Sequence, residues 1–257
     1  MTLIQTRILE RIGYISLNRP EKRNALSPEM VNELKIQLQK MLDNDLVKVV
    51  VIKGEGPVFC SGADLEYLAK IREFSMEENL ADSNNLRELF ELIYHADKLI
   101  ISEVNGPALA GGCGLATICD FCFASDLASF GYTEARIGFV PALVMVYLQQ
   151  KINGKNLREL LLTAEIIPAK KAAEIGLINR VVPASELSEY VFDFANDWNN
   201  SISSSSVTYI KKMLRNISGM NHNEALDYAA ATNAEARMSD DCIRGIDAFL
   251  NKTKIKW

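Results

Sequence analysis

The sequence predicts an α/β fold, and three features support this prediction. Short β-rich runs recur through the first two thirds of the chain, helical stretches separate them, and the run at 47–53 (VKVVVIK) is β-branched almost without interruption. Such a continuous run is typical of a strand with both faces buried, as in a parallel sheet covered by helices. At 257 residues the chain is long enough for one large domain with a helical extension.

The first elements are a hairpin and a helix. Residues 3–9 and 12–18 are rich in β-forming side chains and flank a charged turn that ends at Gly13, so we expect two antiparallel strands. Ser27 is a suitable N-cap, and Pro28 suits the first helical position. Apolar residues then follow at helical spacing, which predicts an amphipathic helix.

Strand and helix signals alternate from there. Residues 47–53 (VKVVVIK) and 99–104 (LIISEV) predict buried strands, with a long helix expected between them in residues 75–97. Another strand is expected at 121–125 (FCFAS), and a helix is expected from Pro141 onwards. This alternation favours repeated strand–strand–helix or strand–helix units.

The last part of the chain is mostly helical. A helix is expected to end near Gly176, a strand follows in LINRVVP, and apolar residues recur at helical spacing beyond it. We therefore expect a core over residues 1–190 and a helical module over residues 191–257. Such a module is suited to covering a site or to packing on another subunit.

Composition and charge restrict the function. The net charge is −5 and the basic residues are scattered, so no face for nucleic acid is indicated. No apolar stretch reaches the length of about 18 residues that a membrane span needs, and the N-terminus lacks the pattern of a secretion signal. The five cysteines lie mostly in apolar surroundings, which favours reduced thiols in a cytoplasmic protein.

Cys119 and Cys122 form a CxxC pair, a spacing found in metal and redox sites. No second pair accompanies them, and the two histidines, His95 and His222, lie far apart in the sequence. The adjoining FCFAS predicts a strand, so we interpret both cysteines as buried packing residues. No metal or redox cofactor is expected.

The segment NGPALAGGCGLATICD (105–120) places glycines at the start of an apolar helix. A P-loop is excluded because Gly112 and Cys113 occupy the lysine and hydroxyl positions of that motif. A dinucleotide-binding turn is excluded because Thr117 takes the third small position and the next acid comes too early. Two interpretations remain, a tight turn needed only for packing or bare backbone N–H groups aimed at a ligand.

A second turn of this kind, Ser61-Gly62-Ala63-Asp64, lies where another extended run becomes helical. Backbone N–H groups at the start of a helix have no intrahelical partner, and they favour negative charge. Donors from the two turns could converge on one oxygen that becomes negative during a reaction. That arrangement is an oxyanion hole.

Six stretches, in order along the chain, resemble the enoyl-CoA hydratase/isomerase superfamily, the crotonases. They are ISLNRPEKRNALS (15–27), VFCSGADLEYL (58–68), NGPALAGGCGLATICD (105–120), SFGYTEARIGFVP (129–141), AAEIGLINRVVP (172–183) and the closing DAFLNKTKIKW. The resemblance implies an α/β crotonase-like spiral of repeated ββα units with a C-terminal helical oligomerisation module. It also implies an acyl-CoA thioester as ligand, with coenzyme A as part of the substrate, and a homotrimer or a dimer of trimers.

The resemblance also assigns roles to residues of this sequence. The thioester oxygen would be held by the backbone N–H groups of Ala63 and Gly111, and Glu134 would be the catalytic carboxylate. The other positions implied to contact substrate or coenzyme A are Lys22, Arg23, Ala25, Ser61, Gly62, Asp64, Leu65 and Gly112. Gly112 would also allow close packing. The two basic residues suit phosphate charge, although a solvated basic turn explains them equally well.

One departure from the family bears on the mechanism. Hydratases of the family commonly use two glutamates, and Gly114 occupies the first of these positions here. Glu134 could have a raised proton affinity among apolar neighbours, or it could be solvated and paired with Arg136 or Arg158. The chain is similar to bacterial hydratases of the 3-methylglutaconyl-CoA type, which also carry glycine there. We therefore expect a hydro-lyase that adds water to a 2-enoyl-CoA, in leucine catabolism.

Three alternatives stay open. A single glutamate suits a Δ3,Δ2-enoyl-CoA isomerase, which moves a proton between two carbons. A catalytically weak acyl-CoA-binding protein would bind thioesters without turnover. Hydrolysis of the acyl-CoA would release a free thiol.

Overall fold

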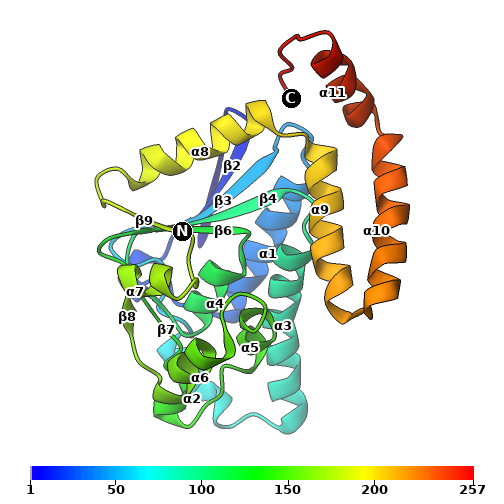
Figure 1. Ribbon diagram of the computed structural model, residues 1–257. Helices are drawn as coiled ribbons and strands as arrows, with labels where there is room; N and C mark the ends of the chain where they lie inside the picture. The colour runs from blue at the N-terminus through cyan, green and yellow to red at the C-terminus, as the bar shows by residue number, and fades with distance from the viewer. Residues whose placement is uncertain (1) are drawn as a thin grey trace.

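The computed structural model describes residues 2–257. Its core is a six-stranded sheet, whose strands in spatial order are β1 (Ile4–Leu9), β2 (Ile12–Leu17), β3 (Val49–Gly54), β4 (Leu99–Val104), β6 (Phe121–Ser125) and β9 (Arg180–Val182). The β1–β2 pair is antiparallel and the other pairs are parallel. Helices cover both faces, as a largely parallel sheet requires (Figure 1), so the predicted α/β class is confirmed.

A three-stranded sheet forms a second layer, with β5 (Ala108–Leu109), β7 (Ser129–Gly131) and β8 (Ile167–Pro168). Three buried strands of the large sheet each lead into an extended segment of this layer and then into a helix. These repeats are β3 with residues 58–63 and α2 (Leu65–Ile71), β4 with β5 and α4 (Gly111–Ile118), and β6 with β7 and α5 (Ala142–Leu148). They are the expected ββα units, arranged as a spiral.

The larger hydrophobic cluster lies between the sheet and the helices α1 (Pro28–Asp43), α3 (Met76–His95) and α4. The hydroxyl of Ser27 accepts a hydrogen bond from the N–H of Met30, so the predicted start of α1 is confirmed. At the start of α3, Ser75 and Glu78 satisfy each other's backbone N–H groups in a capping box. The smaller helices on this side are α6 (Gly154–Thr163), α7 (Ala169–Glu174) and the 3-10 turns Pro20–Lys22 and Glu134–Ile137.

The hairpin forms as predicted, but Gly13 is not part of its turn. The turn consists of Glu10 and Arg11, whose φ angles are 48° and 65°. Gly13 lies inside β2, and a Cβ on it would be only 2.8 Å from the sulfur of Met41. The glycine therefore leaves room for the Met41 side chain of α1 on the sheet, while the two charged residues adopt the left-handed conformation of the turn.

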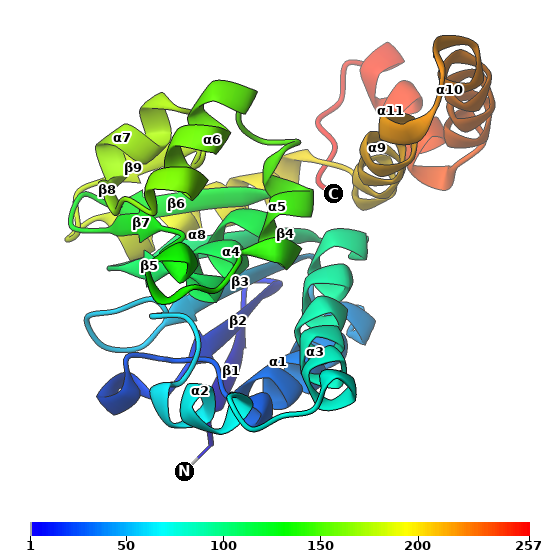
Figure 2. The same ribbon diagram turned by 90° about the horizontal axis from the view of Figure 1, so that it is seen from below.

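The last helices divide between the core and a separate module. Helix α8 (Leu187–Ser201) packs on the second face of the sheet, where Val191 and Ala195 join a cluster with Phe123. The expected boundary between residues 190 and 191 therefore falls inside a core helix. Figure 2 shows the module projecting from the core, and it consists of α9 (Ser204–Asn216), α10 (His222–Arg237), α11 (Asp240–Leu250) and the 3-10 turn Ile217–Gly219. Among residues 2–257, no helix combines the length and the apolar character of a membrane span.

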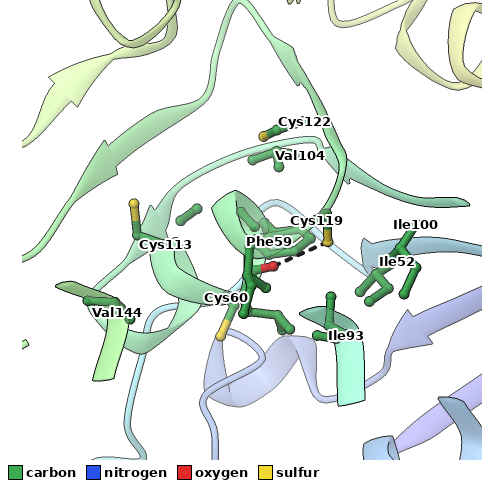
Figure 3. Packing of buried hydrophobic residues seen from close by; sticks show 14 of the residues in the cluster. Ile52, Phe59, Cys60, Ile93, Ile100, Val104, Cys113, Cys119, Cys122 and Val144 are labelled. Atoms are coloured by element: carbon green, nitrogen blue, oxygen red, sulfur yellow. Dashed lines mark hydrogen bonds between the residues drawn. The ribbon is translucent and has the colours of Figure 1, made fainter. Parts of the chain in front are cut away.

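Four of the five cysteines are buried, and Figure 3 shows them around α4: Cys60, Cys113, Cys119 and Cys122. Burial raises the pKa of the first three thiols to about 12 and that of Cys122 to about 11. Cys119 donates to the carbonyl of Leu115, so the CxxC pair packs in the core as interpreted. No cluster of acidic, histidine and cysteine side chains suited to a metal ion lies in the described part of the chain, residues 2–257.

In the folded protein, we expect a disulfide-exchange reagent such as DTNB to titrate Cys242 alone. Thiolate is the reactive form, and burial suppresses both its formation and its contact with reagent at the other four cysteines. The Cys242→Ser variant should therefore react only after denaturation, when four thiols appear. Rapid reaction of a second thiol in the native state would contradict the packing described above.

Candidate active site

Three parallel segments of the second layer end side by side. Cys60 bridges Ala108, and Ala108 pairs with Phe130, all in parallel register. The carboxyl ends of parallel strands meet at one edge, so the residues that follow these three positions are neighbours. Those residues include the three predicted catalytic residues, Ala63, Gly111 and Glu134.

The two turns that carry the predicted N–H donors touch each other. A Cβ on Gly62, whose φ is +89°, would lie 2.8 Å from the Cβ of Ala110 and 3.6 Å from the nitrogen of Gly111. Within residues 2–257, neither the N–H of Ala63 nor that of Gly111 donates a hydrogen bond to the protein. Ala63 is exposed and Gly111 is half-buried, so both donors are accessible. Two adjacent free donors can serve one oxygen as it becomes negative.

The direction of the Gly111 N–H is fixed by the preceding residue. Ala110 has φ 49° and ψ −127°, a conformation that costs a non-glycine residue about 1–3 kcal/mol. Its N–H donates to Gly131 (2.7 Å), and its carbonyl accepts from the N–H of Gly114 (3.1 Å). A trans peptide directs its N–H opposite to its carbonyl, so the Gly111 N–H must point away from α4. Strain at this position fits a functional turn.

The other glycine of the turn packs on protein. A Cβ on Gly112 would lie 2.4 Å from the carbonyl oxygen of Cys60 and 2.7 Å from its sulfur. A Cβ on Gly111 would meet only a methyl group of Leu26, at 3.5 Å. The lack of a side chain at Gly112 therefore lets α4 rest directly on the segment that carries Ala63, as the resemblance implies.

Glu134 is a buried carboxylate at the start of the 3-10 turn that follows β7. It is 8% exposed, and its Oε2 has no hydrogen-bond partner among residues 2–257. Burial raises its pKa above the ordinary value for glutamate. The alternative of a solvated glutamate paired with Arg136 or Arg158 is wrong, because the side chain is buried and none of the ion pairs in the described chain includes it.

Gly114 faces hydrocarbon from two neighbouring helices. A Cβ at this position would lie 2.3 Å from Cγ1 of Val144 in α5 and 3.3 Å from the ring of Phe90 in α3. Both neighbours are buried. The place that the family's first glutamate would take is therefore filled by Val144. A substitution of Gly114 alone cannot restore a second carboxylate without moving α5.

We expect Gly114→Ala to lower the free energy of unfolding by about 1–3 kcal/mol, as overpacking of a core does. The clash outweighs the gain of about 1 kcal/mol in helix propensity, because the nearest atom belongs to a branched side chain on another helix. Adding Val144→Ala should recover most of the loss in urea unfolding. Purely additive effects of the two substitutions would show that the two sites do not interact.

The basic turn implied to meet coenzyme A lies against the first donor turn. The N–H of Ser61 donates to the carbonyl of Arg23 at 3.1 Å, and Leu26 forms a parallel bridge with Ala63. Arg23 is exposed, whereas Ala25 is buried. The structure therefore brings the predicted coenzyme A residues of the two turns together beside the donors.

Two of these side chains are already engaged with protein. Lys22 forms an ion pair with Glu66. Asp64 accepts two N–H bonds from the first turn of α2 and pairs with Arg19 at 2.7 Å. Burial alone would raise the pKa of Asp64, but these hydrogen bonds and Arg19 together hold it below its ordinary value. Asp64 therefore orders the start of α2, where Leu65 is exposed. No local pattern indicated a role for Arg19, since the pair spans 45 positions.

Comparisons with known proteins identify the family. The family described as "Enoyl-CoA hydratase/isomerase" matches residues 7–257. A Thermus thermophilus protein with a provisional enoyl-CoA hydratase name is 38% identical over 241 residues, which cover 94% of this chain and 95% of that protein. The crotonyl-CoA hydratase of Syntrophomonas wolfei is 34% identical over 180 residues, or 69% of this chain and 68% of that protein.

Solved structures give the same result. The crystal structure of human enoyl Coenzyme A hydratase domain-containing protein 3 superposes with a TM-score of 0.92 at 31% identity, covering 100% of both chains. The fold, the match over almost the whole sequence and the identity to these relatives lead to one conclusion. This chain belongs to the enoyl-CoA hydratase/isomerase family.

Proposed function

We propose that this protein adds water reversibly to the double bond of a 2-enoyl-CoA thioester. The proposal rests on the N–H groups of Ala63 and Gly111, which lie on adjacent turns and donate to no protein atom among residues 2–257, and on the buried carboxylate of Glu134, which follows β7 of the same layer. The crotonyl-CoA hydratase among the relatives supports this reaction class. We further propose the 3-methylglutaconyl type of acyl group, in leucine catabolism, on the resemblance noted for the sequence.

In the proposed mechanism, ionised Glu134 takes a proton from water while the water oxygen bonds to Cβ of the substrate. The electrons of the double bond move towards the thioester oxygen, where the N–H groups of Ala63 and Gly111 stabilise the negative charge. Protonated Glu134 then gives its proton to Cα, and the thioester carbonyl re-forms. Each N–H donor of this kind contributes about 10²–10³ in rate, and acid–base transfer contributes about 10²–10⁴.

A double-bond isomerase is the second candidate, and the contact between Val144 and Gly114 favours it. With hydrocarbon in place of a second carboxylate, nothing at position 114 can hold or activate water. Glu134 alone could then remove a proton from one carbon of a 3-enoyl-CoA and return it to another. The same two N–H groups would stabilise the enolate in this reaction.

Turnover in ¹⁸O-labelled water separates these reactions. The purified protein is given crotonyl-CoA, 3-methylglutaconyl-CoA and a 3-enoyl-CoA, and the products are analysed by mass spectrometry. Label in a 3-hydroxyacyl-CoA product is the expected result and ranks the acyl groups. Conversion of the 3-enoyl-CoA without label would support the isomerase, and a free thiol would reveal hydrolysis. Binding without any turnover would overturn the proposed reaction in favour of an acyl-CoA-binding protein.

We also propose that the chain assembles as a homotrimer or a dimer of trimers in the cytoplasm. The helical module exposes large apolar side chains that a single copy leaves uncovered, namely Ile210, Leu214, Leu226, Ile243, Ile246, Phe249 and Leu250. Apolar surface of this kind marks interaction sites. Light scattering coupled to gel filtration would give the number of copies directly, and a monomer would contradict the proposal.

A further inference from the structure

One lysine of the helical module extends into the core, next to the strand β4 and the helix α4. Lys211 of α9 is 7% exposed, and its ammonium donates to the carbonyl of Lys98 (2.8 Å) and to Oδ2 of Asp120 (2.6 Å). Lys98 immediately precedes β4, and Asp120 lies just beyond the end of α4. A single ammonium therefore joins the beginning and the end of the unit β4–β5–α4, which contains Gly111.

The end of this unit is fixed at several further points. The N–H of Asp120 donates to the carbonyl of Ile100 (2.9 Å), and its Oδ2 accepts from the N–H of Ile100 (2.8 Å). The hydroxyl of Ser102 donates to the carbonyl of Ala116 at 2.7 Å, so β4 also holds the last turn of α4. Asp120 therefore connects the sheet with the end of α4 and, through Lys211, with the helical module.

Helix α4 connects this junction with the active site. It has eight residues and is therefore about 12 Å long. Gly111 is its first residue, so a shift or a tilt at the Asp120 end moves the N–H donor at the other end. Placement of catalytic groups is sensitive to such shifts, since an error of about 1 Å can cost 10²-fold in rate.

The neighbouring bases of α9 act elsewhere. Lys212 is half exposed and lies 3.7 Å from Asp97, which follows α3. Arg215 donates to the carbonyl of Tyr94 in α3 at 3.2 Å. These residues hold α9 on the end of α3, whereas Lys211 holds the unit that carries Gly111. Lys212 is therefore a matched control for Lys211, with the same charge, the same helix and a different contact.

We propose that Lys211 is a positioning residue, which ties the β4–β5–α4 unit together from the helical module and so keeps the Gly111 N–H aligned with the thioester oxygen. This inference rests on the proposed function of that donor. Charge-assisted hydrogen bonds in a buried setting are stronger than neutral ones, which suits them to fixing a helix end. Docking of α9 thereby becomes a condition for full activity.

The test compares Lys211→Met with Lys212→Met in the full chain. Hydrogen exchange of residues 108–118 is expected to accelerate in Lys211→Met and to match the wild type in Lys212→Met. For the enoyl-CoA turned over by the wild type, Lys211→Met should lower kcat about 10-fold or more with KM changed less than about 3-fold, because an interaction with the transition state is lost. Equal kinetics and exchange in the two variants would overturn the proposal.

A double variant separates positioning from simple loss of stability. Lys211→Met leaves the carboxylate of Asp120 without its cation, which is destabilising in itself. Asp120→Asn with Lys211→Met removes that unpaired charge, so thermal stability should return while kcat stays low. Recovery of kcat together with stability would show that Lys211 is only a structural partner. A wild type without turnover would refute the proposed reaction, while hydrogen exchange would still decide whether Lys211 fixes α4.

Discussion

Replacing Glu134 with glutamine is expected to lower kcat by about 10²–10⁴, the usual contribution of a positioned acid–base group. Binding of the acyl-CoA should change little, because the N–H donors and the basic turn remain in place. Stopped-flow assays with the preferred enoyl-CoA give kcat, and isothermal titration gives the dissociation constant. Glu189→Gln is the matched control, since that glutamate is exposed on α8 behind the sheet. A Glu134→Gln enzyme with normal turnover would remove Glu134 from the mechanism.

The same substitution has an opposite effect on stability. The pKa of Glu134 is raised by burial in the folded chain, so the native state holds this proton more tightly than the unfolded state does. The stability that this group contributes is present below the unfolded pKa and is lost as pH rises through the raised folded pKa. At neutral pH, Glu134→Gln should therefore melt at a higher temperature than the wild type. The difference should shrink at pH values below the ordinary glutamate pKa of about 4.3.

The raised pKa of Glu134 also sets the pH dependence of kcat. Glu134 must be ionised to accept a proton, so activity should fall as pH drops through its folded pKa. Because burial raises that pKa, the acid limb of kcat should lie above the range of an exposed glutamate. An acid limb at or below about 4.3 would contradict the raised proton affinity of Glu134.

Gly112→Ala is expected to damage both the fold and the activity. Its new Cβ would lie 2.4 Å from a backbone oxygen of Cys60, and a backbone oxygen cannot rotate away as a side chain can. Overpacking of this kind lowers the free energy of unfolding by about 1–3 kcal/mol or more. Relief of the clash requires α4 to lift from residues 58–63, which separates the two N–H donors. Loss of one donor costs about 10²–10³ in kcat.

Gly111→Ala is the matched control for this prediction. Its Cβ would meet only Leu26, at an ordinary contact distance of 3.5 Å, so its unfolding free energy in urea should stay within about 0.5 kcal/mol of the wild type. The two adjacent substitutions thus separate a glycine whose Cβ would clash with backbone from one whose Cβ would make only an ordinary contact. If both variants unfold at the same urea concentration, the close contact between position 112 and Cys60 does not lower the stability of Gly112→Ala.

Local patterns in the sequence predicted the elements that local chemistry determines. The strands expected at 99–104 and 121–125 match β4 and β6 residue for residue, since each is a mostly apolar run flanked by polar residues. The helix start at Ser27 follows from capping chemistry alone. The charged turn of the hairpin was expected to end at Gly13. The actual constraint on Gly13 is contact with Met41, which only the packed structure shows.

Contacts between distant positions lay beyond prediction. The amphipathic pattern of α8 does not say which surface its apolar side covers, so the boundary at residue 190 had no local basis. The sequence showed that Gly114 lacks a carboxylate, but nothing in it indicated that Val144 fills the space. Lys211 and Asp120 lie 91 positions apart, and each is an ordinary charged residue in its own segment. The glycine patterns indicated the two turns that carry the donors. The contact between these turns could not be predicted, because it depends on the parallel pairing within the second layer.

The contact between Val144 and Gly114 also has a historical consequence. A descendant of this protein that acquired glutamate at position 114 first would place its Cβ 2.3 Å from the valine and would fold poorly. A descendant that first exchanged Val144 for a smaller residue would lose some packing energy but would keep its fold and gain the room. The first order passes through an overpacked intermediate, and the second passes through one that already has room for the new side chain. The number of carboxylates in this lineage therefore depends on a residue that carries no charge and performs no chemistry.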